Sequence, residues 1–341
     1  MAKHKTNSVP SEAAILVLLL VILTATALAS FSVGRYSIGI FDILRYVFSG
    51  TFLDENVPVV ITEVRMPRII GAILAGGALS VSGAACQGLF RNPMVSPDIL
   101  GVSSGAGFGA AIAILLSMSL MWIQVSAFLA GILAVCTALF VSRIIGSGHD
   151  RILMLVLSGM IVASLFSALI SLMKYIADSD FKLPDITFWL MGSLSGVSMS
   201  DVRLALPVTL IAIVPLFLSS WKLNVLSFGE EEAKTLGVNT ARLRTVIICC
   251  TSLLTASVVC ITGMIGWVGL IVPHFARFIT GPNHKILLPA SFLIGSTFML
   301  LVDDLARSIS SLEIPLGIIT ALVGAPVFLA LLKVSSKRAW Q

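Results

Sequence analysis

Apolar stretches of about 20 residues recur along the whole chain, and they constrain the fold more than any other feature of the sequence. A helix rises ~1.5 Å per residue, so each stretch is long enough to cross a ~30 Å hydrocarbon core. Inside a membrane only helices and closed barrels satisfy their backbone hydrogen bonds. Barrel strands would be shorter and would alternate polar with apolar residues. The sequence therefore predicts an all-α polytopic membrane protein.

The charge content supports the same fold class and argues against several others. Of 341 residues, 57% are apolar and 11% are charged, whereas about a quarter of a soluble chain is charged. The 22 Lys and Arg residues are dispersed singly among the predicted loops, so we do not expect nucleic-acid binding. The five cysteines lie inside apolar stretches, and the four histidines are scattered near loops. We therefore expect no metal site and no cofactor in this chain.

The apolar stretches predict about ten transmembrane helices in one domain that covers residues 1–341. The predicted spans are 13–33, 66–89, 97–117, 121–143, 152–175, 202–221, 243–263, 267–280, 286–306 and 315–333. The eighth is too short to cross a membrane unaided. The first contains Ala27-Leu28-Ala29, so a removable signal peptide is the alternative to a retained span. We favour the span because the run is longer than a usual signal sequence.

An even number of spans places both termini on one side of the membrane. The loops of that side hold 14 of the 22 Lys and Arg residues, which predicts cytoplasmic termini. The cytoplasmic parts are then the tails 1–12 and 334–341 and the segment 222–242. Two longer segments, 34–64 and 177–200, fall on the outside. The second contains a short apolar run that is either a partly inserted helix at the outer mouth or an interfacial helix.

The sequence lacks the groups that would let this chain do work by itself. An ion-coupled transporter needs ionisable groups at bilayer depth, but Lys174, Asp303, Asp304 and Arg307 fall near span ends. There is no phosphate-binding G-x-x-x-x-G-K-[ST] motif. No Ser-His-Asp or paired-carboxylate arrangement stands at matched depth in the spans, which argues against an intramembrane enzyme. Active transport would therefore take its energy from a partner.

The cytoplasmic segment 226–239 is the best candidate for receiving that energy. Within it, three consecutive glutamates predict the start of a short surface helix, and Gly237 predicts the turn that ends this helix. The helix is either a solvated loop element without a partner or one that fits a cleft on an ATPase and relays its motion into the neighbouring spans.

Short motifs that follow one another along the chain indicate a family. They are Arg65-Met66-Pro67-Arg68, Arg91-Asn92-Pro93, Leu100-Gly101, Glu231-Glu232-Ala233 with Leu236-Gly237, Gly266-Trp267-Val268-Gly269, Asp303 to Arg307, and Glu313-Ile314-Pro315-Leu316-Gly317. In this order they resemble the FecCD-type permeases of bacterial ABC importers, which carry iron-siderophore complexes, haem or cobalamin. The resemblance covers roughly residues 15–335. Family members usually have Phe at the position of Trp267.

The resemblance implies a type II ABC importer permease in the cell inner or plasma membrane. Two such permease subunits, identical or paralogous, would enclose one pathway. Two cytoplasmic ATPase subunits would carry ATP and Mg²⁺, so this chain would have no catalytic residue. A substrate-binding protein would dock on the outside. The expected cargo is a ferric siderophore, with haem, cobalamin or an oxyanion as alternatives, and a stand-alone secondary transporter is less favoured.

The resemblance also implies which arginines receive the binding protein. Arg65, Arg68 and Arg307 match the external arginines that pair with acidic residues of its two lobes. Arginine suits this role because its planar fork pairs bidentately with a carboxylate. The alternative is that these arginines snorkel at span ends or pair within the chain with Glu63, Asp303 or Asp304.

On the cytoplasmic side the resemblance makes the segment 228–240 the region that contacts the ATPases. The residues expected to make these contacts are Glu231, Glu232, Ala233, Leu236 and Gly237. The loop between the fourth and fifth spans is a candidate cytoplasmic gate, because small residues allow close approach and reopening. Its candidate gate residues are Ser147, Gly148 and His149.

Overall fold

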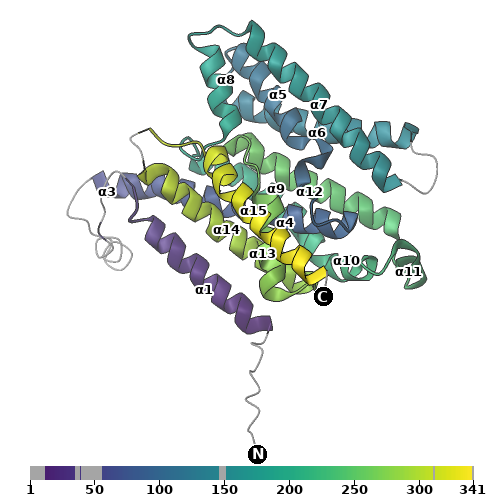
Figure 1. The fold of residues 1–341 in the computed structure, drawn as a ribbon. Coiled ribbons are helices and arrows are strands. Elements are labelled where there is room, and N and C mark those ends of the chain that lie inside the picture. The colour runs from purple at the N-terminus through teal and green to yellow at the C-terminus, as the bar shows by residue number, and fades with distance from the viewer. Residues whose placement is uncertain (1–11, 35–38, 40–55, 146–150, 310–311, 340–341) are drawn as a thin grey trace, which may run out of the picture.

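The computed structural model describes residues 12–34, 39, 56–145, 151–309 and 312–339, and within these ranges it contains helices and no strand. Figure 1 labels the elements. They are α1 (Glu12–Ser30), α3 (Asn56–Val59), the π-helical η1 (Val60–Arg65), α4 (Met66–Phe90), the 3-10 helix η2 (Pro97–Leu100), α5 (Val102–Leu115), α6 (Leu120–Ile145), α7 (Arg151–Ile176), α8 (Lys182–Met191), α9 (Met199–Leu218), α10 (Ser220–Leu226), α11 (Glu230–Thr235), α12 (Thr240–Thr262), α13 (Val268–Thr280), α14 (His284–Ser308) and α15 (Leu316–Ala339).

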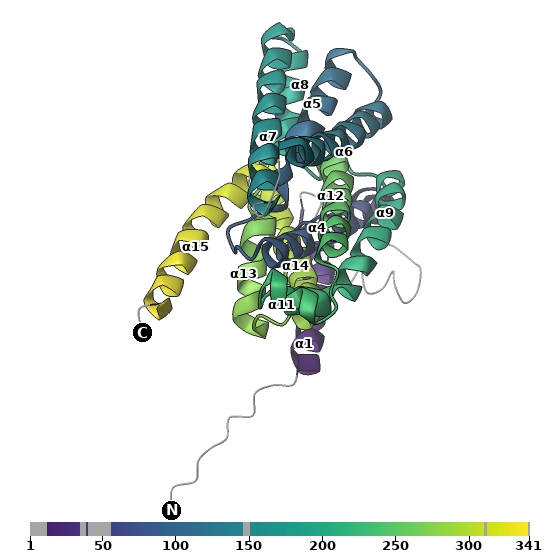
Figure 2. The same cartoon turned by 90° about the vertical axis from the view of Figure 1, so that its right-hand side faces the viewer.

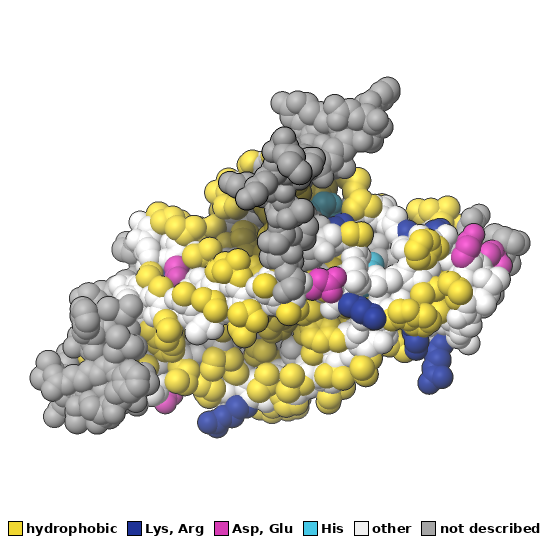
Figure 3. Space-filling view, turned by 90° about the horizontal axis from the view of Figure 1, so that it is seen from below, with side chains coloured by type: hydrophobic (Ala, Val, Ile, Leu, Met, Phe, Trp, Pro, Cys, Tyr) yellow, Lys and Arg dark blue, Asp and Glu magenta, His cyan; other side chains and the backbone are white. Residues whose placement is uncertain are grey.

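The described helices confirm the predicted all-helical membrane fold. Seven stretches are long and apolar enough to cross a membrane, and α5, α13 and the first part of α15 are shorter apolar helices. Together they correspond one to one with the ten predicted spans. Hydrophobic side chains cover much of the face seen in Figure 3, and Lys and Arg residues stand at isolated points on it. Such a surface is stable in lipid but would aggregate in water.

Two predicted boundaries differ from the structure. The third span was expected over 97–117, but Pro97 opens a 3-10 turn and Gly101 has a left-handed φ of +80°, so α5 starts at Val102 and has 14 residues. The segment 34–64 was expected outside the membrane helices, yet α3 and η1 continue directly into α4. The result is one helical stretch, Val57–Phe90, of 34 residues.

Helix α4 lies at the centre of the molecule, and α9, α12, α13 and α14 pack around it (Figure 1). In the most apolar 18-residue part of the stretch Val57–Phe90, 89% of the residues are buried, whereas in that of α6 the share is 28%. Two glycines explain how α4 fits between these neighbours. A Cβ added at Gly76 would lie 2.1 Å from the carbonyl oxygen of Gly295 on α14, and one at Gly83 would lie 1.8 Å from that of Gly269 on α13. At both points the helix backbones touch.

Helices α5, α6, α7 and α8 form a second group, which occupies the upper part of Figures 1 and 2. Small residues again allow close packing, since a Cβ at Gly105 would lie 2.5 Å from the carbonyl oxygen of Ala130. Helix α12 contacts both α4 of the central group and α5 and α6 of this group. It therefore joins the two groups.

The elements that connect the spans lie at two opposite ends of the bundle (Figures 1 and 2). The start of α1 and the end of α15 point toward the end that carries α10 and α11. Helices α3 and α8 lie toward the other end. This arrangement agrees with an even number of crossings, and α15 runs as far as Ala339, into the predicted C-terminal tail.

Candidate functional sites at the two ends of the bundle

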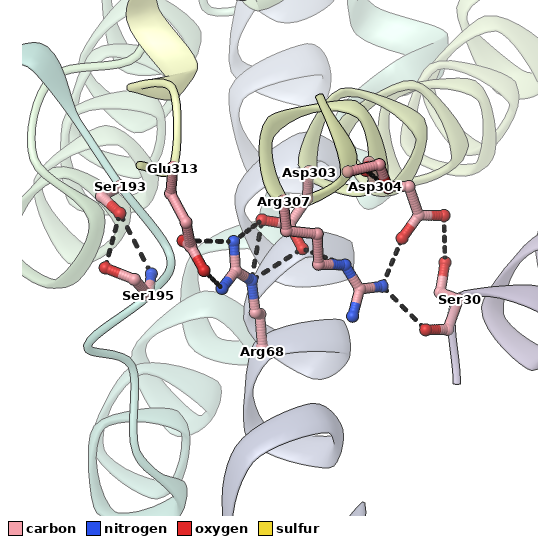
Figure 4. Close-up of polar contacts among 9 residues, drawn as sticks. Ser30, Arg68, Ser193, Ser195, Asp303, Asp304, Arg307 and Glu313 are labelled. Carbon is pink, nitrogen blue, oxygen red and sulfur yellow. Dashed lines mark hydrogen bonds and ion pairs between the residues drawn. The ribbon is translucent and has the colours of Figure 1, made fainter. Parts of the chain in front are cut away.

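A buried ion pair holds α4 and α14 together at the end of the bundle near α3 (Figure 4). Arg68 stands in the first turn of α4 and Asp303 in the last turns of α14. Arg68 Nε donates to Asp303 Oδ1 at 3.0 Å and to Oδ2 at 2.9 Å, and its Nη2 lies 2.9 Å from Oδ1. The side chains are 7% and 1% exposed. Burial makes such a pair sensitive, because a charge left without its partner is costly.

Glu313 extends this pair to a third segment of the chain. It lies in the connection between α14 and α15, where its Oε1 accepts a hydrogen bond from Arg68 Nη1 at 3.0 Å and its Oε2 lies 2.9 Å from Nη2. The guanidinium of Arg68 thus satisfies two carboxylates at once. Figure 4 shows Ser193 and Ser195 on the far side of Glu313. Arg68 therefore fixes α4, α14 and the start of α15 relative to one another.

Arg307 continues the network toward α1. Its Nη2 donates to the carbonyl oxygen of Ser30 at 2.7 Å and to Asp304, and its Nε lies 3.7 Å from Asp303 Oδ2. Ser30 Oγ in turn donates to Asp304 Oδ2 at 2.7 Å. The last turn of α1 is therefore anchored to the last turns of α14.

Arg65 completes the group of predicted docking arginines. It donates to the carbonyl oxygen of Phe31, just after α1. The structure brings Arg65, Arg68 and Arg307 to the same end of the bundle, but it leaves them only 3%, 6% and 6% exposed. Arg68 and Arg307 pair with Asp303 and Asp304, as the alternative interpretation of the sequence expected. Their role in docking stays a prediction.

The opposite end of the bundle carries the predicted ATPase-contacting segment. Glu230 opens α11 and binds the start of α12 through both carboxylate oxygens: Thr240 Oγ1 donates to one at 3.0 Å, and Arg244 Nη2 donates to the other at 3.1 Å. Gly229 before α11 and Gly237 after it have φ values of +138° and +80°, which favour glycine. Ala233 of α11 is fully buried on the inner side of the helix. Helix α11 is therefore held firmly against α12.

The outer side of α11 is exposed and combines acidic with apolar groups. Glu231 is 83% exposed and bonds Lys234 at 2.8 Å, a hydrogen bond that raises the pKa of this lysine. Glu232 and Gly237 are exposed, and Leu236 is 60% exposed. Phe228, 75% exposed, adds a large apolar side chain next to α11. Four of the five predicted contact residues thus face outward, whereas Ala233 faces inward.

Sequence analysis missed Phe228 as an exposed group and Glu230 as the residue that positions α11. An aromatic side chain directly before Gly229, at the start of a polar turn, was the available signal for the first. The role of Glu230 depends on Arg244 in another helix and had no local signal. The candidate gate residues Ser147, Gly148 and His149 lie outside the described residues. Trp267 packs edge-on against Phe328, with the ring centroids 6.5 Å apart.

Comparisons with known proteins agree with this geometry. The model of the FecCD transport family matches residues 19–334. The chain is 44% identical over 313 residues to the molybdate import system permease protein MolB of Haemophilus influenzae, covering 91% of this chain and 92% of the relative. It is 41% identical over 288 residues to the cobalamin import system permease protein BtuC of Halobacterium salinarum, covering 84% and 77%.

A solved structure described as a metal-chelate type ABC transporter in an inward-facing conformation matches with a TM-score of 0.85 and 44% identity, over 94% of this chain and 98% of that chain. The fold and the two ends of the bundle define a polytopic membrane permease. The chain belongs to the FecCD transport family and is an ABC importer permease.

Replacing Asp303 with Ala should destabilise the protein by about 3 kcal/mol, because it leaves the buried Arg68 short of one carboxylate. The midpoint of thermal unfolding of the purified protein in detergent measures the effect. Replacing the exposed Glu231 with Ala is the matched control and should leave the midpoint unchanged. The triple variant Arg68→Met/Asp303→Leu/Glu313→Gln, which also neutralises the second carboxylate of Arg68, should regain much of the loss. Full stability of the Asp303→Ala protein would contradict the assigned role of the ion pair.

Proposed function

We propose that this chain and a second permease subunit form the pathway of a binding-protein-dependent importer that a separate ATPase drives by alternating access. The observation that carries the proposal is the build of α11. Its inner side is fixed to α12 by Glu230, while Phe228 and Leu236 stand exposed beside two glutamates. A helix that is fixed on its inner side and flanked by exposed apolar side chains is suited to fill a cleft on a partner.

Force applied to α11 has a direct route into the spans. The Arg244–Glu230 pair ties α11 to α12, and α12 packs against the central helix α4. Helix α12 also contacts α5 and α6 of the second group. Closure of two ATPase subunits on ATP and Mg²⁺ would thus move both helix groups. The permease itself performs no covalent chemistry in this scheme.

The end with the arginine network is where we place the binding protein. Arg65, Arg68 and Arg307 remain the candidate contacts for its acidic residues. Since all three are buried and engaged, an incoming carboxylate would have to draw an arginine out of the network.

For the cargo we propose a ferric siderophore-type chelate. The support is the match to a transporter described as of the metal-chelate type. An oxyanion is the second candidate, because the relative MolB, named for molybdate, is 44% identical over 91% of this chain. The two candidates differ in size and charge, so one uptake experiment separates them.

Replacing Leu236 with Ser should lower ATP-driven uptake about ten-fold, because it removes an exposed apolar group from the surface offered to the ATPase. Uptake into proteoliposomes that contain the permease, ATPase and binding protein measures it. Leu129→Ser, which alters a leucine of the same exposure, 60%, in the middle part of α6, is the control. If both variants transport equally well, α11 is not the ATPase contact.

Replacing Arg65 with Gln should weaken binding of the substrate-binding protein about ten-fold, because it removes the positive charge, and should lower the unfolding temperature only slightly, because the Gln amide can still donate to the Phe31 carbonyl. Surface plasmon resonance on the reconstituted permease measures the affinity. Arg203→Gln removes an equal charge from an exposed position on α9 and should have no effect. A parallel loss of affinity and stability in Arg65→Gln would show that Arg65 only supports the fold.

The intact importer should accumulate a ⁵⁵Fe-labelled ferric siderophore and should ignore labelled molybdate at equal concentration. Uptake by the same proteoliposomes with and without ATP measures both. Accumulation of molybdate alone would refute the ferric cargo and support the oxyanion, while the transport scheme would stand.

A further inference from the structure

A cavity of about 330 Å³ opens between α6, α7 and α12, at the end of the bundle that carries α10 and α11. Its inner wall is apolar and consists of Leu139 on α6, Leu155 on α7 and Ile248 on α12. On α6 and on α12 an arginine and an apolar residue lie four positions apart, and these two pairs show which part of the cavity is deeper. Arg143 follows Leu139 by one helical turn, and Arg244 precedes Ile248 by one turn, so each arginine stands nearer to the helix end than its apolar neighbour. The cavity is therefore apolar inside and basic at its rim.

The rim also offers hydroxyl groups and an excess of positive charge. Ser142 and Thr245 line the cavity beside the two arginines. Glu230 is the carboxylate paired with Arg244, at 3.1 Å from Nη2, and the buried Nε of Arg244 has no hydrogen-bond partner. Within the described part of the chain, no ion pair engages Arg143. The described rim therefore carries two guanidinium groups, of which Arg244 is paired with a carboxylate.

We propose that this cavity binds an anionic phospholipid, with its phosphate at Arg143 and Arg244 and an acyl chain along the apolar wall. Guanidinium groups bind phosphate oxygens through paired hydrogen bonds, and hydroxyl groups add further donors. Basic pockets between transmembrane helices recognise acidic lipid headgroups in this way. A free oxyanion would use the rim but gain nothing from the inner wall, whereas an amphipathic lipid uses both.

The surface next to the cavity supports a lipid occupant. On α12 the exposed positions Ala241, Thr245 and Cys249 follow one another at intervals of four and form one stripe. Cys136 on α6 is exposed as well. These small side chains leave room for an acyl chain to run from the cavity toward the middle of the membrane.

The site has a consequence for α11, because Arg244 belongs to both. A lipid phosphate at Arg244 would share this guanidinium with Glu230, which fixes α11 to α12. Lipid occupancy should therefore tune how firmly α11 is held. That effect rests on the proposed function of α11, whereas the binding itself requires only that the chain spans a membrane.

The test is a titration of the purified full-length permease in detergent with phosphatidylglycerol, followed by native mass spectrometry. Arg143→Gln should weaken the first lipid-binding step about five-fold, the effect of one arginine near a phosphate. Arg242→Gln is the matched control, since it removes an exposed arginine from the same end of α12 outside the cavity, and its affinity should equal that of the unaltered protein. Glu230→Gln should retain or strengthen binding, because it removes the carboxylate that competes for Arg244.

Three outcomes would overturn the proposal. Equal effects of Arg143→Gln and Arg242→Gln would show that charge at this end acts without a site. Binding of phosphatidylcholine with the same affinity and the same dependence on Arg143 would show that acidic lipid is not selected. Displacement of the lipid by millimolar inorganic phosphate would assign the cavity to free oxyanions. A failure of the ATPase contact at Leu236 would leave the lipid site intact, so the two proposals fail separately.

Discussion

The backbone contact between α4 and its neighbours is the constraint on which the rest of the structure depends. At Gly76 and Gly83 there is no space for a Cβ, because the carbonyl oxygens of Gly295 and Gly269 already occupy it. Because the backbones of α13 and α14 touch α4 at these two glycines, neither helix has much freedom to shift along α4. The positions of the helix ends follow from it, and so does the meeting of Arg68 on α4 with Asp303 on α14. The glycines allow α4 and α14 to pack closely, and the Arg68–Asp303 ion pair stabilises this packing.

The length of the apolar stretches was enough to predict the helices, because the bilayer imposes that length. It could not predict the two boundaries that differ. The third span loses its first residues to the 3-10 turn at Pro97 and the left-handed Gly101, and both are matters of backbone geometry that average hydropathy does not register. The segment 34–64 was placed outside the membrane helices, whereas in the structure residues 57–64 belong to the same helical stretch as α4. In the structure Arg65 is buried, so its charge did not mark a helix end.

The candidate sites show the same division between local and distant information. The motif around Arg65 and Arg68 located the correct end of the bundle, and the acidic run before Gly237 located the surface helix. The partners that position Arg68 and Glu230 lie outside these motifs. Asp303 lies 235 residues after Arg68, and only the packing of α14 on α4 brings the two together. The exposed or buried state of an arginine depends on such a partner, which is why sequence could name these residues but could not state how accessible they are.

The two ends of the bundle differ in how their charged side chains are buried, and the difference fits the proposed drive by an ATPase at the α11 end. At the α3 end, Arg68 and Arg307 pair with Asp303, Asp304 and Glu313, and this network ties α1, α4, α14 and the segment before α15 to one another. At the α11 end Glu231, Glu232 and Lys234 are exposed, and among the described residues one charge pair, Glu230 with Arg244, joins α11 to α12. In the proposed scheme a force on α11 would pass through α12 to α4, which the arginine network joins to α14. Tight packing converts small shifts at one end into movement of whole helices, because packed cores change between discrete arrangements rather than deform continuously.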